Sequence, residues 1–386
     1  MYNLKTPLSE YKCQSSKDNM GKRALLTLED GSIYEGYSFG AKDTTYGEVV
    51  FNTSMSGYQE MLTDPSYAGQ ILVLTYPLIG NYGVNDSYFE SKQVQVRGLV
   101  VREHCPVPSH WQSTGSLSEL LQANGIPGIS GVDSRALTRR LRSTGVMMGI
   151  MTSEMTPEET LQELKGLPRY DSTDFVKQVA IDKKYQWGLT SDDAALLHHI
   201  VIVDMGLKYN IARILTQLGC LVTVVPCTMA VEDILNLKPD GIVLSPGPGD
   251  PALLDYITKT VRKLAQRKPV MGICLGHQMI GTAFGARTFK LKFGHRGGNH
   301  PVRDLASGRV YITTQNHGYA VDADNLKGGL EVSQINLNDG TVEGLRHREL
   351  PVISIQYHSE GSPGPQDNVY LFDRFLKIVK ERSTIV

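Results

Sequence analysis

The fold is decided by residues 270–278, which read VMGICLGHQ. Val270–Ile273 is a short and wholly apolar run, and an amphipathic segment with helical spacing follows the cysteine. Between the two lies Gly-x-Cys-x-Gly, with Gly272 and Gly276 two residues to either side of Cys274. An apolar strand, a glycine-flanked turn and a helix in this order are the cysteine form of the nucleophile elbow. The pattern therefore predicts a strand that presents Cys274 at the N-terminus of a helix.

An elbow of this kind would give Cys274 unusual chemistry. The helix dipole and the free N–H groups of the first turn favour the thiolate over the thiol. The N–H of Leu275 would then point at the oxyanion of a tetrahedral intermediate. The same sequence is also compatible with a buried structural cysteine in a tight turn, so the motif needs support from the rest of the chain.

The sequence around the elbow predicts an α/β domain. Ile200–Asp204, Leu221–Val225 and Gly241–Leu244 are apolar runs of strand length, and Lys208–Leu218 between the first two is amphipathic. Continuous apolar strands that alternate with helices are typical of an open, mostly parallel sheet covered on both faces. Ligands bind such sheets at the carboxyl ends of the strands, where the elbow also lies.

A second glycine-rich turn follows Gly241–Leu244. Residues 245–251 read SPGPGDP, in which prolines fix the backbone and glycines allow dihedral angles closed to other residues. Such a rigid turn can aim the N–H of Gly249 at a ligand, although it also fits an ordinary strand-to-helix connection. No Gly-Lys-Ser/Thr follows, so the turn is not a phosphate-binding P-loop.

A cysteine nucleophile needs a base, and the sequence offers His358. An alternating strand, residues 353–357, leads into His358-Ser359-Glu360. Residues two apart in an extended chain project to the same side, so Glu360 can hold the imidazole of His358 in the tautomer that accepts the thiol proton. A lone His-x-Glu is a weak signal, but with the Cys274 elbow it forms a coherent catalytic set.

The remaining cysteines and histidines predict no metal site. The other cysteines are scattered, with neither a Cys-x-x-Cys pair nor zinc-site spacing. We expect small buried or incidental residues at Cys13, Cys105, Cys220 and Cys227. His295 and His300 flank a Gly-Gly pair, but the sequence shows no carboxylate cluster that would support them as ligands.

The first half of the chain contains short β-type runs separated by turn signals, and capped segments that predict helices. The predicted strands are Ala24–Leu28, Ile33–Tyr37, Gly47–Phe51, Gln70–Thr75 and Gln93–Val101. The predicted helices are Ser116–Asn124, Ser134–Arg142 and, further on, Pro157–Lys165. We divide the chain into a polar N-terminal extension (1–21), a mixed α/β domain (22–150), a connector (151–198) and the C-terminal α/β domain (199–386).

The composition of the 386 residues restricts the functional classes. Hydrophobic residues make up 41% and charged residues 20%, which is ordinary for a folded globular chain. The formal net charge of −1 disfavours a dedicated nucleic-acid binder, which would carry a basic surplus. No apolar run has the length of a membrane span, and the N-terminus lacks the apolar core of a signal peptide. We expect a cytoplasmic protein that binds neither nucleic acid nor membrane.

Together these motifs resemble a known family. The elbow GICLGHQ, the loop SPGPGDP and the late His-x-Glu are similar to those of class I (triad-type) glutamine amidotransferases. The first half resembles one branch of that family, the small subunits of carbamoyl-phosphate synthetases. The similar segments are FNTSMSGYQE (51–60), LTDPSY (62–67) and GVDSRALTR (131–139), together with QNHGY (315–319) in the second half. The resemblance covers roughly residues 22–380.

The resemblance implies roles for individual residues. Cys274 would be the nucleophile, His358 the base, and Glu360 the group that orients the base. L-Glutamine would be held by Ser54, Gly247, Gly249, Leu275, Gln278, Asn316, Gly318 and Tyr319. The family usually has His-Pro-Glu, and this chain departs from it with Ser359 between base and carboxylate. We expect serine to preserve the extended geometry and the activity.

The resemblance also implies a partner. Ammonia released from glutamine would pass to a large synthetase subunit, which makes carbamoyl phosphate from bicarbonate and ATP for arginine or pyrimidine synthesis. ATP and Mg²⁺ would be used by that subunit, and we expect no cofactor and no metal in this chain. The expected assembly is a heterodimer, and the number of heterodimers that associate is left open.

Three alternatives remain open. The chain could be the amidotransferase component of another synthase, such as the anthranilate type, although those components usually lack a domain with a Ser54-type segment. It could be a free-standing cysteine hydrolase of glutamine or γ-glutamyl substrates, which would be fast without a partner. A non-catalytic binding protein is the third alternative, and it predicts that Cys274 does not react with glutamine analogues.

Overall fold

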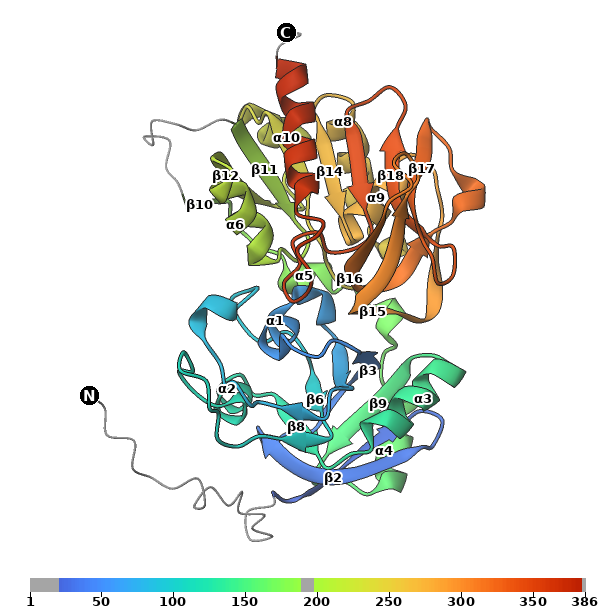
Figure 1. Ribbon diagram of the computed structural model, residues 1–386. Coiled ribbons are helices and arrows are strands. Elements are labelled where there is room, and N and C mark those ends of the chain that lie inside the picture. Colours follow the sequence, from blue (N-terminus) through green and yellow to red (C-terminus); the bar gives the residue numbers. More distant parts are fainter. Residues whose placement is uncertain (1–20, 189–197, 384–386) are drawn as a thin grey trace, which may run out of the picture.

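The computed structural model describes residues 21–188 and 198–383, which form two domains (Figure 1). The first domain, coloured blue to green at the bottom of Figure 1, is built around a barrel. The second domain, yellow-green to red above it, is built around one large sheet. The predicted N-terminal extension, with Cys13, lies outside the described residues apart from Gly21.

The first domain is a closed barrel, where the sequence predicted a mixed α/β domain without a defined topology. The strand order is β1-β2-β8-β6-β4-β3-β9, and it combines parallel and antiparallel pairs. The strands are β1 (Arg23–Leu28), β2 (Ile33–Gly40), β3 (Thr45–Asn52), β4 (Gln70–Leu74), β6 (Gly98–Val100), β8 (Pro127–Ser130) and β9 (Met147–Thr152). A small separate ladder joins β5 (Leu78–Ile79) to β7 (Glu103–His104).

The barrel core consists of alternate residues from its strands. Leu26, Val49 and Ile71, from β1, β3 and β4, are fully buried in one cluster. Since residues two apart along a strand point to the same side, and since the cluster draws on strands all round the closure, this core is the interior of the barrel. Leu137 and Leu141 of α3 (Ser134–Thr144) pack against the same cluster.

The three predicted helices of the first domain and the connector begin within one residue of their predicted starts. Ser116 and Thr156 each form a capping box, at α2 (Leu117–Ala123) and α4 (Pro157–Leu164), and Asp133 accepts the N–H of Ala136 at the start of α3. A side-chain oxygen at this position satisfies an amide that has no partner within the helix. A further short helix, α1 (Tyr58–Thr63), lies against the second domain (Figure 1).

The prediction of a strand over Gln93–Val101 is right only for β6. The N–H groups of Gln95 and Arg97 are bonded to the carbonyl oxygens of Leu62 and Gln70 instead of entering a regular ladder. Val94 and Val96 are nevertheless buried. The alternation of apolar residues therefore reports burial here, and not strand pairing.

The expected connector, residues 151–198, contributes to both domains. Helix α4 packs on β1 and β9, and the hydroxyl groups of Thr160 and Thr27 are hydrogen-bonded at 2.9 Å. After a turn at Tyr170–Ser172 and the short α5 (Val176–Val179), β10 (Tyr185–Trp187) pairs with β12 as an antiparallel edge of the second sheet. This edge strand was not predicted from the sequence.

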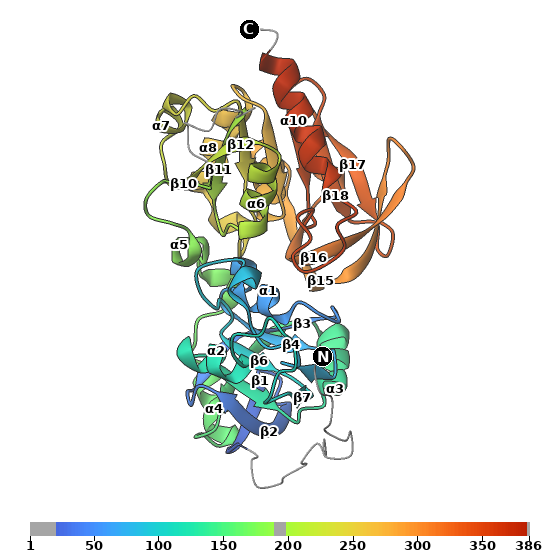
Figure 2. The same cartoon turned by 60° about the vertical axis from the view of Figure 1, so that its left-hand side comes forward.

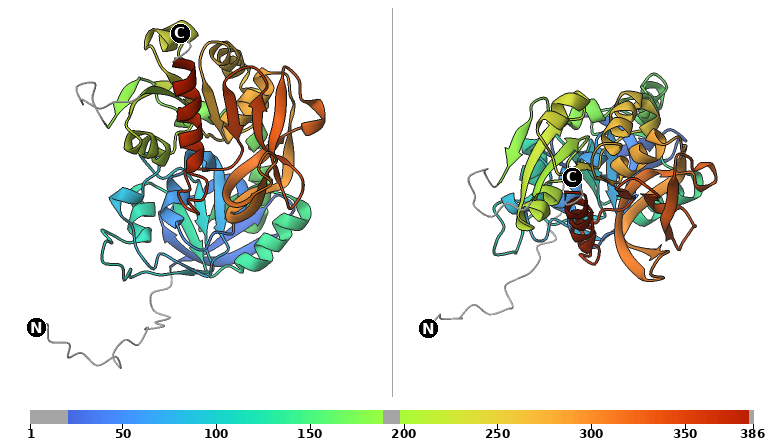
Figure 3. Two further views of the ribbon diagram at one scale, coloured as in Figure 1. Left: turned by 45° about the horizontal axis from the view of Figure 1, so that its top comes forward. Right: turned by 90° about the horizontal axis from the view of Figure 1, so that it is seen from above.

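The second domain confirms the predicted α/β class. Its central strands are parallel neighbours in the order β12 (Cys220–Pro226), β11 (His198–Asp204), β13 (Gly241–Leu244), β14 (Val270–Ile273) and β19 (Val352–Ile355). The helices α6 (Tyr209–Gln217) and α10 (Tyr370–Ser383) pack on one face of the sheet. The helices α7 (Val231–Asn236), α8 (Asp255–Ala265) and α9 (Leu275–Ala283) pack on the other. Figure 3 shows α10, in red, in front of this sheet.

An antiparallel extension that was not predicted continues the sheet beyond β19. It consists of β18 (Val342–His347), β17 (Leu330–Asn336), β15 (Thr288–Asp304) and β16 (Val310–Val321). The lower ends of β15 and β16 lie next to the first domain (Figure 2), where the carbonyl of Arg296 accepts the N–H of Thr53 at 3.3 Å. The extension therefore brings the first domain to the edge of the sheet.

Glu90 of the first domain binds several groups of the second. Its buried carboxylate accepts the N–H of Asn210 at 3.0 Å, the guanidinium of Arg213 at 2.9 Å and the hydroxyl of Ser362 at 2.8 Å. Asn210 lies in the first turn of α6, whose own N-cap residue, Lys208, makes no capping bond with its side chain. A carboxylate at this place satisfies a free helix amide and complements the helix dipole.

Candidate active site

The structure contains the elbow that the sequence predicted. Cys274 precedes α9 and has φ of 53°, a left-handed value that is costly for a residue with a side chain. The turn is tight on both sides: a Cβ atom at Gly272 would lie 2.6 Å from the carbonyl oxygen of Gly276, and one at Gly276 would lie 2.4 Å from that of Leu244. Glycine is therefore required at both positions for the chain to turn here.

His358 and Glu360 are brought together as the His-x-Glu spacing predicted. Nδ1 of His358 lies 2.6 Å from Oε1 of Glu360, with Ser359 between them in the chain, so serine preserves the geometry. Nε2 of His358 is buried and has no hydrogen-bond partner in the part of the chain that the structure describes. The Cys274 thiol, also buried, lies 3.7 Å from the carbonyl oxygen of Asn316.

The charges of this group are mutually stabilised. Burial lowers the pKa of His358, but the Glu360 carboxylate outweighs burial and raises that pKa to about 10, with the Cys274 thiol contributing in the same direction. Burial raises the pKa of Glu360, but Lys208 and His358 outweigh it and lower that pKa to about 2. The ionised Glu360 carboxylate therefore stabilises the protonated form of His358, which is the form that arises when the imidazole takes up the thiol proton.

Lys208 is a member of the site that the sequence analysis missed. It is almost completely buried, and its Nζ lies 2.9 Å from the same Oε1 of Glu360 that faces His358. Burial lowers the pKa of Lys208, but Glu360, Asp64 and Glu90 outweigh burial and raise it. The sequence feature that could have identified Lys208 is its position between an apolar strand and an amphipathic helix. A lysine buried at such a position needs an anionic partner.

Most of the residues expected to hold glutamine line one cavity, which also contains Cys274 in its wall. Of the predicted set, the lining residues are Gly247, Gly249, Gln278, Asn316, Gly318 and Tyr319, together with Cys274. Two predicted residues, Ser54 and Leu275, are not among the lining residues. The side-chain amide nitrogen of Gln278 already has partners in the protein. It donates to the carbonyl oxygen of Tyr319 at 2.8 Å and to the side-chain oxygen of Gln356 at 3.0 Å.

The first domain and the connector supply a wall of this cavity that was not predicted. Glu48 of β3 lines it and forms an ion pair of 2.7 Å with Lys290 of β15, so the wall is tied across the domain boundary. Tyr170 of the connector also lines it, and its hydroxyl oxygen accepts the N–H of Gly249 at 3.1 Å. The candidate site is thus formed by both domains and the segment between them.

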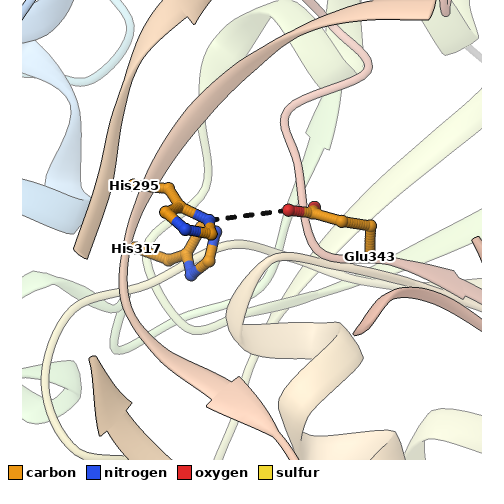
Figure 4. Close-up of side chains that lie close together, drawn as sticks. All are labelled: His295, His317 and Glu343. Carbon is orange, nitrogen blue, oxygen red and sulfur yellow. Dashed lines mark ion pairs between the residues drawn. The ribbon is translucent and has the colours of Figure 1, made fainter. Parts of the chain in front are cut away.

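Figure 4 shows a second buried cluster, in which the rings of His295 and His317 lie beside the carboxylate of Glu343. In this cluster one ligand atom of each residue lies within 4.8 Å of the others, and Asp339 also lies 2.8 Å from Nε2 of His295. No carboxylate cluster near His295 was predicted from the sequence. That interpretation was wrong, because β18 and the turn before it bring both carboxylates there.

The bonding of the second cluster favours a buried imidazolium over a metal. Both ring nitrogens of His317 are engaged, by the carbonyl of Tyr319 and the side chain of Gln315. Glu343 accepts the amides of Gln315 and Asn336. Burial lowers the pKa of His295, but Asp339 and Glu343 outweigh burial and raise it to about 9. A metal would have to displace several of these bonds, whereas a protonated His295 needs no rearrangement.

The other described cysteines lie outside both clusters. Cys220 and Cys227 are buried, and burial raises the pKa of both thiols to about 12. Cys105 is partly exposed and forms no disulfide with the other described cysteines, and its thiol donates to the carbonyl oxygen of Val107 at 3.3 Å. Cys220 and Cys227 are thus buried, as expected, and their raised pKa values favour the thiol form, which does not act as a nucleophile.

Comparisons with known proteins identify the family to which the chain belongs. Residues 201–378 match the model of the class I glutamine amidotransferase family, so the second domain defines the class of protein. Residues 26–151 match the model of the carbamoyl-phosphate synthase small chain, CPSase domain. This chain belongs to the carbamoyl phosphate synthase small chain family.

Relatives cover nearly the whole chain. A carbamoyl phosphate synthase small chain from Akkermansia muciniphila is 50% identical over an alignment of 367 positions, and the match covers 92% of this chain and 97% of that protein. Proteins of the same name from Syntrophotalea carbinolica and Aquifex aeolicus are 46% and 48% identical and cover 93% and 94% of this chain. They confirm the predicted enzyme class, a glutamine-hydrolysing small subunit. Within residues 21–188 and 198–383, no helix is both long and apolar enough to cross a membrane.

Proposed function

We propose that this chain is the glutaminase subunit of a glutamine-dependent carbamoyl phosphate synthase, with Cys274 as nucleophile, His358 as base and acid, and Glu360 as the group that orients His358. The observation that carries the proposal is the strained backbone of Cys274, which holds its thiol at a helix N-terminus beside the 2.6 Å His358–Glu360 pair. Strain of this kind is maintained at functional sites because the surrounding structure holds it in place.

The proposed reaction begins with the sulfur of Cys274. The thiol proton passes to Nε2 of His358, and Sγ attacks the carboxamide carbon of glutamine. The oxyanion that forms would accept hydrogen bonds from the N–H groups of Gly249 and Leu275. His358 then gives its proton to the leaving nitrogen, the C–N bond breaks, and ammonia departs from a γ-glutamyl thioester.

A water molecule completes the cycle. His358 takes a proton from the water as it attacks the thioester, and glutamate leaves as the thiol is restored. Glu360 holds the imidazole through Nδ1 throughout, and Lys208 keeps that carboxylate ionised. The substrate glutamine would lie in the cavity lined by Gly247, Asn316 and Tyr319. Ser54 and Leu275, which do not line this cavity, would contact the bound substrate as well.

The proposal includes a partner and a destination for the ammonia. Membership of the small-chain family supports a large synthetase subunit as the partner, which would use ATP, Mg²⁺, bicarbonate and the delivered ammonia to make carbamoyl phosphate. A cytoplasmic heterodimer that serves arginine or pyrimidine synthesis follows from the same proposal. No cofactor is assigned to this chain, since the proposed reaction needs only the thiol, the imidazole, backbone amides and water.

Replacing Cys274 tests the proposal directly. In the complex with its large subunit, Cys274→Ser should abolish glutamine-dependent carbamoyl phosphate synthesis and leave ammonia-dependent synthesis intact. Cys220→Ser, at a buried thiol outside the cavity, is the matched control and should keep both activities. Glutamine-dependent turnover near the unmodified rate in Cys274→Ser would rule out the assignment.

A second measurement separates the proposal from a free-standing hydrolase. Glutamate release is followed for the chain alone and after the large subunit is added. A partner-dependent glutaminase should be slow alone and faster in the complex. A chain that hydrolyses glutamine or γ-glutamyl substrates equally fast in both states would favour the free-standing hydrolase.

A further inference from the structure

The hydroxyl of Tyr170 accepts a hydrogen bond from a backbone N–H that the proposed reaction needs. The N–H of Gly249 is directed at the Tyr170 hydroxyl oxygen, 3.1 Å away. In the proposed mechanism the same N–H stabilises the oxyanion of the tetrahedral intermediate. An N–H group has one hydrogen, so a bond to Tyr170 weakens or excludes the bond to the oxyanion.

The position of Tyr170 is fixed by groups outside the second domain. Its buried ring stacks on Phe175 with ring centroids 4.8 Å apart, and both belong to a small core with Ala68 and Met148. Ala68 and Met148 belong to the first domain, and Met148 lies in barrel strand β9. Figure 2 shows the neighbouring α5 at the junction of the two domains. The barrel therefore determines where the hydroxyl of Tyr170 lies.

The bond between Tyr170 and Gly249 is of a kind that can be exchanged. Burial raises the pKa of Tyr170, so the hydroxyl remains neutral and is a weaker acceptor than an oxyanion. Gly249 has φ of 93°, a conformation that glycine leaves without a side-chain penalty. The N–H of Gly249 can therefore exchange the Tyr170 hydroxyl for a stronger acceptor. Breaking the bond to the hydroxyl reduces the stabilisation that the new bond provides.

We infer that Tyr170 is a positioning residue, which acts through Gly249 and holds the oxyanion donor in a less reactive setting while the chain is alone. A shift of the barrel or of the connector, as expected when the synthetase partner docks, would move Tyr170 and release the donor. This inference rests on the proposed function, because it gives the Gly249 N–H a role in the same reaction. It also gives a physical cause for a glutaminase that is slow without its partner.

The test is Tyr170→Phe, which removes the hydroxyl and keeps the stacked ring. Glutamate release by the chain alone should rise roughly fivefold in kcat, the factor expected for losing one competing neutral hydrogen bond, with KM for glutamine within about twofold. Alkylation of Cys274 by a diazo-ketone analogue of glutamine should accelerate in the same way. In the complex with the large subunit, the difference from the unmodified chain should fall below about twofold.

Tyr256→Phe is the matched control. The Tyr256 hydroxyl bonds Asp174 of the connector at 3.1 Å, so the change removes a similar contact without touching Gly249. Its kcat should stay at the unmodified level, and thermal unfolding should show both variants folded. An unchanged or lower kcat in Tyr170→Phe, or an equal rise in Tyr256→Phe, would overturn the inference and leave the proposed function standing. Glutamate release that survives Cys274→Ser would overturn the proposed function itself.

Discussion

Two buried histidines of the second domain have similar surroundings but differ in their suitability for proton transfer. His358 lies 2.6 Å from one carboxylate, Glu360, and His295 lies 2.8 Å from another, Asp339. Carboxylates raise the pKa of both imidazoles, to about 10 and about 9 respectively. By charge alone, either histidine could be taken for a catalytic residue.

The difference lies in the second ring nitrogen. Neither Nε2 of His358 nor Nδ1 of His295 has a hydrogen-bond partner among the described residues, but Nε2 of His358 has the Cys274 thiol as a neighbour. Nδ1 of His295 instead faces the carboxylate of Glu343 at 3.6 Å, so that ring lies between two carboxylates. A raised pKa shows that a histidine is stabilised as a cation. An uncommitted ring atom beside a nucleophile is what makes the cation useful for proton transfer.

The largest expected effect is the difference in kcat between two variants in which one of these histidines is replaced by asparagine. His358→Asn should lower kcat for glutamine hydrolysis by at least about 10³-fold, because it removes the only proton carrier proposed for both steps. His295→Asn touches no reacting atom and should leave kcat within about a factor of three. Glutamate release measured for both variants checks the comparison, and a similar loss in His295→Asn would show that the second cluster takes part in the reaction.

Removal of Lys208 should have the next largest effect, on stability. Lys208→Met leaves the buried Glu360, Asp64 and Glu90 without the cation that they share. Breaking a buried ion pair on one side costs about 3 kcal/mol or more. Urea unfolding measures the free energy of unfolding, and Lys290→Met, at a pair that is partly exposed, is the control with a smaller expected loss. Equal losses in the two variants would contradict the central role given to Lys208.

The second cluster should respond to pH through stability. The pKa of His295 is raised in the folded chain from its usual 6.5 to about 9, so its contribution is complete below pH 6.5 and disappears as the pH rises through 9. We expect the unmodified chain to exceed His295→Gln in unfolding free energy by about 2 kcal/mol below this window, since partial exposure of Asp339 weakens the pair. Unfolding free energies measured on either side of the window provide the check. A difference that stays constant with pH would mean that His295 is not charged.

The smallest expected effect concerns Ser359. Its hydroxyl is fully buried and has no hydrogen-bond partner in the described part of the chain. Ser359→Ala removes an unsatisfied polar group and should stabilise the chain by about 1 kcal/mol, while glutamine hydrolysis stays within about twofold. Thermal unfolding and glutamate release measure the two quantities. A large loss of activity would show that the serine does more than separate base and carboxylate.

The elbow and the His358–Glu360 pair could be predicted because both are local. Glycines two residues from Cys274, and a carboxylate two residues from the base, specify geometry within a few residues of chain. The starts of α2, α3 and α4 were predictable for the same reason, because a capping side chain lies directly before each helix.

What could not be predicted depends on pairing between distant segments. The barrel closes through contacts between short strands whose register no local pattern fixes. Asp339 and His295 are 44 residues apart in sequence, and Lys208 and Glu360 are further apart still, so their ion pairs exist only once β18 and β19 take their places in the sheet. Tyr170 was missed because nothing in a polar, irregular connector marks one residue as the partner of a loop amide in another domain.

The capping of α6 by Glu90 has a consequence for protein engineering. A glutamine-hydrolysing module would be attractive to transplant onto other synthetases, but residues 199–386 alone would lack this carboxylate. Asn210, Arg213 and Ser362 would lose a shared acceptor, and the helix that begins just after Lys208 would start without a cap. A transplant should therefore carry Glu90 with its supporting loop, or replace it with an acidic side chain placed at the start of that helix.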